Sequence, residues 1–193
     1  MQTPSKEAIS PALEAIFDTG ALAGKWVLDP RNSSVRLRSN VLWGLIPVTG
    51  IFREVSGSGT VSSDGDVTGT LTVAAASIDT TSTRRDKHLR SADFFDCAAY
   101  PFITFSVDGV RAHGQGVVMS GALRVRDRTR TVSFDASVVV KSGDNIQTDA
   151  QVDINRADFG MTCNRMHAVS LNNSITIRAA FSKRPPVVPD HLV

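Results

Sequence analysis

One segment of the sequence, residues 81–95 (TSTRRDKHLRSADFF), gathers many of the side chains that could do chemistry. It holds four cations, one imidazole and two carboxylates: Arg84, Arg85, Lys87, Arg90, His88, Asp86 and Asp93. The segment lies among valine- and threonine-rich stretches that are typical of β-strands. Its residue types allow three interpretations: a catalytic loop, a site for phosphate or nucleic acid, or the piece of chain that closes a barrel.

Catalysis is the weakest of these interpretations. His88 and Asp86 could exchange protons with a substrate, but the sequence has no G-x-S-x-G, P-loop, H-E-x-x-H or strand-linked G-x-G-x-x-G motif. A metal site built from His88, Cys97, Cys163 and His167 is conceivable, yet their spacing matches no metal-binding motif. The sequence therefore predicts a protein that is not an enzyme and has no metal centre or cofactor.

Composition narrows the class of protein further. A chain of 193 residues suits one domain with an added arm, and 41% hydrophobic and 21% charged residues are ordinary for a globular protein. The net charge of +2 is too small to indicate a nucleic-acid partner. The cysteines Cys97 and Cys163 lie far apart and predict two free thiols. Because we find no signal-like or membrane-spanning apolar run, we expect a cytoplasmic protein without stable membrane insertion.

From Trp26 onward, apolar residues recur with a period of two. The clearest case is residues 146–154, where Ile146, Thr148, Ala150, Val152 and Ile154 face one way and polar residues face the other. Strands with one apolar face indicate an antiparallel sheet. Hairpin signals at 62–66, 108–116, 126–130 and 141–145 separate about eight such strands. The sequence predicts an all-β, up-and-down barrel, with a sandwich as the alternative.

Three parts follow from this pattern. Residues 5–17 form a good helical stretch, because Ile9, Leu13 and Ile16 recur at helical spacing. The predicted parts are an N-terminal helical arm over 1–24, a barrel domain over 25–182 and an extended proline-rich tail over 183–193.

The inward-facing side of the predicted barrel is rich in small residues, and aromatic residues make up only 6% of the chain. Such a lining leaves room for a ligand, although a flattened barrel could close the same space. The residues that we expect to line the barrel are Leu71, Val73, Ile103, Phe105, Met119, Leu123, Phe134, Val138, Val152 and Ile154.

Arg156 breaks this apolar pattern, because the parity of residues 146–154 places it on the inward side. A buried guanidinium without a partner costs several kcal/mol, so we expect Asp86, Asp158 or a phosphate beside it. The alternative is that Arg156 leaves the barrel at its rim.

The segment 81–95 is predicted to be a short amphipathic plug. Ser82 or Thr83 can cap a helix over residues 84–91, with Leu89 facing inward. Its charges either tie the plug to the barrel, for example through an Asp86–Arg90 pair at i, i+4, or meet an anionic ligand at the mouth. The candidates for anchoring or ligand contact are Arg85, Asp86, His88, Arg90 and Arg156.

Residues 77–105 (SIDTTSTRRDKHLRSADFFDCAAYPFITF) strongly resemble the hallmark of the YceI-like family. Four further stretches resemble family motifs: WVLDPRNSSV (26–35), VTGIF (48–52), YPFITF (100–105) and INRADFG (154–160). The resemblance covers roughly residues 25–182. It implies a lipocalin-like barrel that binds polyisoprenoid lipids.

The resemblance and the small-residue lining together predict a non-catalytic binding or carrier protein. Its ligand would be a long isoprenoid lipid, either a polyprenyl phosphate or an isoprenoid quinone, with the 81–95 segment near the mouth. The alternative is a protein-interaction or stress-related module whose barrel is filled by side chains and binds no lipid. A homodimer is possible under either hypothesis.

Overall fold

The computed structural model describes residues 19–41, 45–163 and 169–185. The predicted helix at 5–17 and most of the predicted tail lie outside the described residues. The described part is a single antiparallel sheet of eleven strand segments with one α-helix in the long connection. The strands are β1 (Gly24–Leu28), β2 (Ser34–Val41), β3 (Ile46–Phe52), β4 (Val55–Val61), β5 (Val67–Ala74), β6 (Ile78–Asp79), β7 (Phe102–His113), β8 (Gly116–Val125), β9 (Arg128–Ser142), β10 (Asn145–Asn155) and β11 (Val169–Lys183).

The first three strands of the barrel are each interrupted once. β1 and β2 are separated by a 3-10 turn at Pro30–Asn32, where Pro30 has no N–H to donate and Asp29 accepts a bond from the Arg31 N–H at 2.9 Å. β3 and β4 form the next strand, since β2 pairs with β3 and β1 with β4. β5 and β6 form the third in the same way. The segments therefore make eight long strands.

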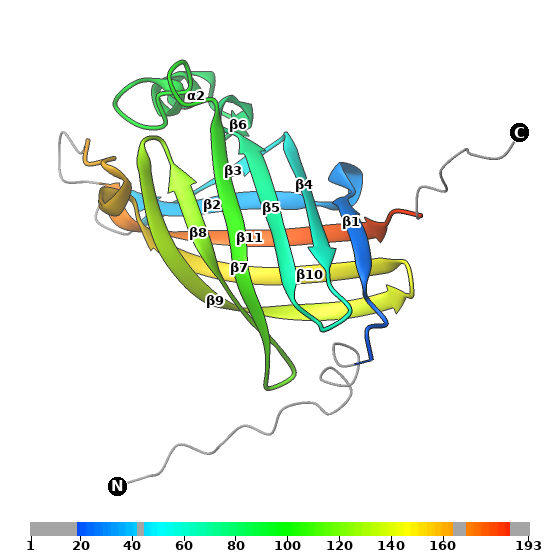
Figure 1. The fold of residues 1–193 in the computed structure, drawn as a ribbon. Helices are drawn as coiled ribbons and strands as arrows, with labels where there is room; N and C mark the ends of the chain where they lie inside the picture. Colours follow the sequence, from blue (N-terminus) through cyan, green and yellow to red (C-terminus); the bar gives the residue numbers. More distant parts are fainter. Residues whose placement is uncertain (1–18, 42–44, 164–168, 186–193) are drawn as a thin grey trace, which may run out of the picture.

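The sheet closes on itself, because β1 also pairs with β11. The closing register places Trp26 opposite Lys183 and Leu28 opposite Phe181. Figure 1 shows the strands wrapped around a common interior. The prediction of an eight-stranded, up-and-down, lipocalin-like barrel is confirmed, and the sandwich alternative is wrong.

Strands β9 and β10 separate toward one end of the barrel. The β9–β10 ladder ends at Ala136 and Ala150, and beyond these residues the two strands diverge (Figure 1). The 3-10 turn η3 (Arg156–Phe159) follows β10 at this end and contacts both β9 and β11. Since the strand ladder stops short here, other parts of the chain must cover the opening.

The cap over this end is the helix α2 (Thr83–Arg90) and the loop that leads to β7 (Figure 1). The Ser82 side chain caps the helix by accepting a hydrogen bond from the Arg85 N–H, as predicted. Leu89 and Phe95 pack on the main core cluster, and the Phe95 ring meets Phe52 edge-on at 5.8 Å. No helix among the described residues is long and apolar enough to cross a membrane.

The opposite end is closed by side chains. Leu22, Trp26 and Val61 form a small buried cluster there. The Trp26 indole N–H donates to the Leu22 carbonyl at 2.8 Å, so this buried polar group is satisfied. The barrel is therefore closed by packed side chains at one end and by the α2 cap at the other.

Candidate ligand cavity inside the barrel

A cavity of about 450 Å³ lies inside the barrel beneath the cap. This volume falls within the ~300–1,000 Å³ that is usual for small-molecule sites. Strands from both sides of the barrel contribute to its wall, and the cap contributes Leu89, Phe94 and Phe95. The wall is almost entirely apolar, so its shape and chemistry fit a hydrocarbon rather than a polar metabolite.

All of the residues predicted to line the barrel face one of two interior spaces. Leu71, Val73, Ile103, Phe105, Leu123, Phe134, Val152 and Ile154 line the main cavity, and Met119 and Val138 line the second. Most of these side chains are only half-buried, because their inner surface faces open space. Side chains that filled the barrel would bury one another instead. The interior is therefore hollow.

The second cavity, of about 150 Å³, lies toward the closed end. Leu71, Phe105, Phe134 and Ile177 line both cavities. The rings of Phe105 and Phe134 have their centroids 5.4 Å apart. The two cavities therefore lie next to each other, with this aromatic pair in the wall that they share.

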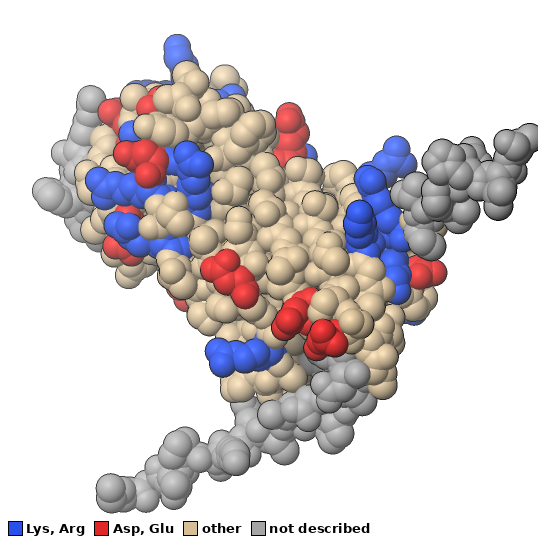
Figure 2. All heavy atoms as spheres, viewed as in Figure 1, with Lys and Arg blue, Asp and Glu red and all other residues tan. Residues whose placement is uncertain are grey.

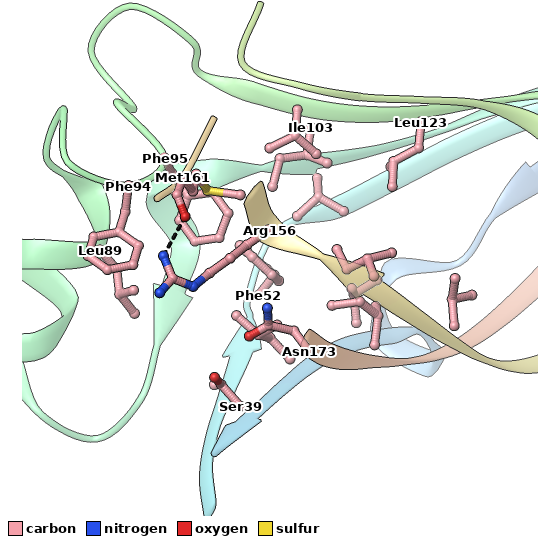
Figure 3. A pocket seen from close by; sticks show the side chains of 18 of the residues that line it. Ser39, Phe52, Leu89, Phe94, Phe95, Ile103, Leu123, Arg156, Met161 and Asn173 are labelled. Atoms are coloured by element: carbon pink, nitrogen blue, oxygen red, sulfur yellow. Dashed lines mark hydrogen bonds between the residues drawn. The ribbon is translucent and has the colours of Figure 1, made fainter. Parts of the chain in front are cut away.

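Arg156 lies at the inner side of the cap and is only 5% exposed. Its Nη1 donates to the carbonyls of Met161 and Cys163, and its Nε donates to the Ser170 carbonyl at 3.1 Å. Figure 3 shows it between the cap residues and the barrel wall. The predicted inward position is confirmed, but the predicted carboxylate partner, Asp86 or Asp158, is wrong. Backbone carbonyls of the chain after β10 take that place.

The charge of Arg156 is not neutralised by these contacts. Carbonyl oxygens accept hydrogen bonds but carry no net charge, and Nη2 is buried without a hydrogen-bond partner among the described residues. Burial lowers the pKa of the Arg156 guanidinium, and the nearby Cys163 thiol opposes that shift. An arginine nevertheless stays protonated in proteins. The apolar cavity thus has one buried positive charge in its wall.

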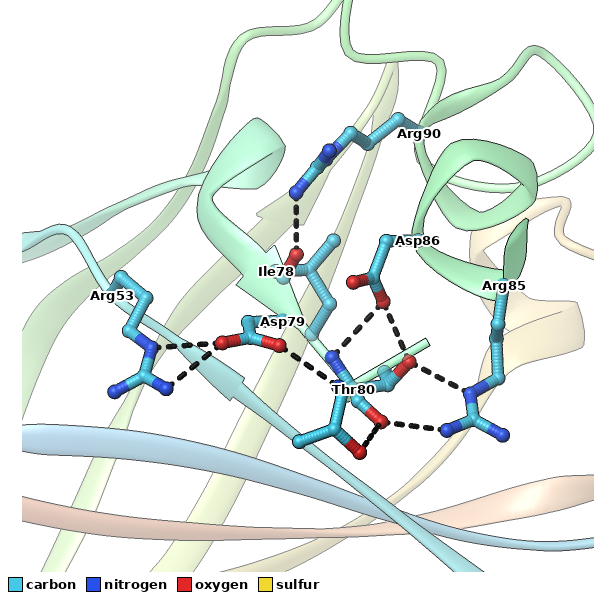
Figure 4. A network of polar contacts seen from close by, with 8 residues as sticks. Arg53, Ile78, Asp79, Thr80, Arg85, Asp86 and Arg90 are labelled. Carbon is cyan, nitrogen blue, oxygen red and sulfur yellow. Dashed lines mark hydrogen bonds and ion pairs between the residues drawn. The ribbon is translucent and has the colours of Figure 1, made fainter. Parts of the chain in front are cut away.

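A polar network ties the cap to the barrel (Figure 4). Asp86, which is 8% exposed, accepts hydrogen bonds from the Thr80 N–H at 2.9 Å and the Thr80 hydroxyl at 2.5 Å. Arg85 donates to the same hydroxyl and to the Thr80 carbonyl, both at 2.7 Å. Arg90 donates to the Ile78 carbonyl at 2.7 Å. The predicted Asp86–Arg90 pair is therefore wrong, because each side chain binds the chain before the helix instead.

Two other residues that we expected to contact a ligand lie at the cavity wall. Arg85 lines the cavity, but its Nε and Nη2 already donate to Thr80. His88 also lines the cavity, and its side chain is half-exposed. Its Nε2 lies 3.3 Å from an oxygen of Asp93, and its ring meets Phe94 edge-on at 5.0 Å. Of the predicted cations, Arg156 is thus the best placed to meet a ligand.

Sequence reasoning missed two polar residues in the cavity wall, Ser39 and Asn173. They lie opposite each other in the β2–β11 register, and Figure 3 shows both near the end of the cavity where Arg156 lies. Asn173 is buried and donates to the Leu171 carbonyl at 2.8 Å, whereas the Ser39 hydroxyl has no partner among the described residues. Asn173 continues the inward alternation of Ile175 and Ile177, so the sequence pattern could have placed it in the cavity wall.

We expect the substitution Asp86→Ala to loosen the cap. It would leave the buried Thr80 N–H without an acceptor, which costs about 1–3 kcal/mol. Urea denaturation should therefore show a lower free energy of unfolding than in the parent protein. Asp64→Ala, on the exposed β4–β5 turn, is the matched control and should change little. Equal effects of the two substitutions would contradict the role given to Asp86.

On the face shown in Figure 2, basic side chains at the capped end are interspersed with carboxylates. In the cap loop, Asp96 lies 3.9 Å from the Arg126 guanidinium. A nucleic acid favours an extended basic surface. The mixed charges on this face do not form one.

The sequence profile of the YceI-like domain matches residues 26–182, which is most of the chain. The chain belongs to the YceI-like family. Curated relatives include Protein YceI of Escherichia coli O6:H1, 38% identical over 74 residues that cover 38% of this chain and 39% of that protein. Protein YceI of Salmonella arizonae is 28% identical over 157 residues, covering 76% of this chain and 82% of that protein. The chain thus spans well under half of the first of these relatives and most of the second.

Solved structures of this YceI-like fold agree with the barrel. BcnA of Burkholderia cenocepacia has a TM-score of 0.72 at 20% identity, covering 79% of this chain and 98% of that one. A polyisoprenoid-binding domain from Saccharophagus degradans has a TM-score of 0.67 at 17% identity, covering 82% and 98%. At these identities the likeness concerns the fold alone.

Proposed function

We propose that this YceI-like protein is a non-catalytic binding protein for an isoprenoid lipid with an anionic head, such as a polyprenyl phosphate. The observation that carries the proposal is the combination of an apolar cavity with one buried, unneutralised arginine in its wall. The cavity would hold the tail, and Arg156 would meet the head. The printed description of the Saccharophagus degradans domain as polyisoprenoid-binding supports the class of ligand.

The tail would supply most of the affinity. Removing a methylene group from water is worth about 0.8 kcal/mol, so a five-carbon isoprene unit contributes roughly 4 kcal/mol before the cost of ordering the chain. The half-buried wall residues would lose their remaining contact with water at the same time. The alternative of a filled barrel without a lipid does not account for the interior space of the main cavity.

The head would be selected by charge. An isoprenoid quinone could accept a hydrogen bond from Nη2 of Arg156, but it would leave the buried positive charge uncompensated. A phosphate would both accept the hydrogen bond and supply the opposite charge. We therefore favour the phosphate over the quinone. The carrier role, the cytoplasmic location and the homodimer stay predictions.

The test compares ligands that differ only in the head. Lipid-free protein is titrated with a polyprenyl phosphate and with the uncharged polyprenol of equal length, by displacement of a fluorescent lipid. The phosphate should bind at least tenfold more tightly, and mass spectrometry should recover both lipids chemically unchanged. Equal affinities would contradict the anionic head, and recovery of a converted lipid would contradict a non-catalytic role.

A further inference from the structure

Three side chains of types that commonly bind transition metals meet at the mouth of the barrel. They are His88 near the end of α2, Asp93 in the loop that follows, and Cys163 in the chain after β10. One candidate ligand atom from each lies within 4.8 Å of the other two. His88 and Cys163 also line the main cavity. The cluster thus joins two segments that are far apart in sequence.

We propose that His88, Asp93 and Cys163 bind a zinc ion at the barrel mouth. An imidazole nitrogen, a carboxylate oxygen and a thiolate sulfur are common ligands of Zn²⁺, at about 2.0–2.3 Å from the metal. Ligand atoms around a tetrahedral Zn²⁺ lie roughly 3.3–3.8 Å apart. The observed separations need only small side-chain rotations to reach this range. Three protein ligands leave the fourth position open.

Neighbouring contacts hold two of the three ligands in place. The His88 ring packs edge-on against the Phe94 ring, with the two centroids 5.0 Å apart. The Arg156 guanidinium lies over the same Phe94 ring, 5.5 Å from its centroid. Arg156 also donates to the Cys163 carbonyl at 3.1 Å. The same arginine therefore positions both sides of the cluster. Its charge disfavours a nearby cation, but a carboxylate and a thiolate supply two opposing charges.

The chain offers internal controls for this site. Cys97 is the other cysteine, but it packs against the main hydrophobic cluster, and burial raises the pKa of its thiol. His113 and Asp135 form a second exposed histidine–carboxylate pair, with Nδ1 3.0 Å from the carboxylate, and they belong to no three-ligand cluster among the described residues. The cluster thus differs from both controls in combining all three ligand types.

The bound ion would connect α2 and the loop after it to the chain that follows β10 and η3. Since metal binding to the folded state adds to its stability, saturating Zn²⁺ should raise the melting temperature of the full chain. This readout needs no lipid, so the metal site and the proposed lipid function can fail independently.

The experiment titrates metal-free protein with Co²⁺, which reports on zinc sites through a thiolate-to-metal charge-transfer band in the near ultraviolet. We expect the band in the parent protein, its loss on adding Zn²⁺, and its absence in Cys163→Ser. His88→Ala and Asp93→Asn should weaken Zn²⁺ binding at least tenfold. Cys97→Ser and His113→Ala should leave binding unchanged.

Three outcomes would overturn the proposal: no band in the parent protein, a band that survives in Cys163→Ser, or a band that disappears in Cys97→Ser. Circular dichroism of each variant verifies that it is folded before titration. Should Cys163→Ser fail to fold, the Zn²⁺ affinities of His88→Ala and Asp93→Asn decide, and parent-like values in both would overturn the proposal.

Discussion

Replacing Arg156 by methionine is expected to weaken binding of a polyprenyl phosphate by about ten- to a hundredfold. A hydrogen bond to a charged group contributes about 1.5–3 kcal/mol, which corresponds to this range. Binding of the uncharged polyprenol should stay close to that of the parent protein, because the methionine side chain adds to the apolar wall. The two dissociation constants, measured by lipid displacement, give the change in preference.

The same substitution should also lower stability. It removes the donors that serve the carbonyls of Met161, Cys163 and Ser170, and leaving the buried Met161 carbonyl without a partner would cost about 1–3 kcal/mol. Binding is therefore compared at a temperature where the variant is folded. Arg156→Lys retains the charge and should retain part of the preference for phosphate. A full preference for phosphate in Arg156→Met would show that another group binds the head.

Filling the cavity is expected to abolish lipid binding without unfolding the barrel. Val152→Trp places a large ring in the main cavity from β10. Excluding one isoprene unit would cost roughly 4 kcal/mol, which reduces affinity by at least ~100-fold. Because the ring enters open space, the melting temperature should stay near that of the parent protein. Overpacking a filled core would instead cost about 1–3 kcal/mol.

Val139→Trp is the matched control. Val139 lies on the neighbouring strand β9 but is 51% exposed, so its replacement should leave both affinity and stability close to those of the parent protein. A Val152→Trp variant that loses stability and keeps its affinity would indicate that the tail lies elsewhere.

The barrel could be predicted from the sequence because its strands alternate strictly. Once a few residues of a strand are assigned to its inward face, every second residue along the strand can be assigned to the same face, since the side-chain period of a strand is two. The alternation along β10 therefore predicts Val152, Ile154 and Arg156 in the wall of the barrel interior. The interruptions of the first three strands were missed. They arise from local events such as the turn at Pro30, and the inward parity shifts there: Trp26 and Leu28 are the buried residues of β1, whereas Val35 and Leu37 face the interior from β2.

The partners of the charged residues could not be predicted in the same way. Asp86 and Arg90 have the spacing of a helical ion pair, but buried backbone groups before the helix need partners and take precedence. Two of the three carbonyls that accept hydrogen bonds from Arg156, those of Met161 and Cys163, lie outside any strand, where no periodicity exists to place them, and the third, that of Ser170, lies at the start of β11. The proximity of Cys163 to His88 likewise depends on the segment after β10.

Mass spectrometry of lipid extracted from protein purified without detergent would show directly whether the barrel holds a polyprenyl phosphate. We expect an isoprenoid lipid with a phosphate head, near one molecule per chain, and a much lower amount from the Val152→Trp variant. A barrel that is empty after purification, and that also fails to take up added polyprenyl phosphate, would contradict this expectation.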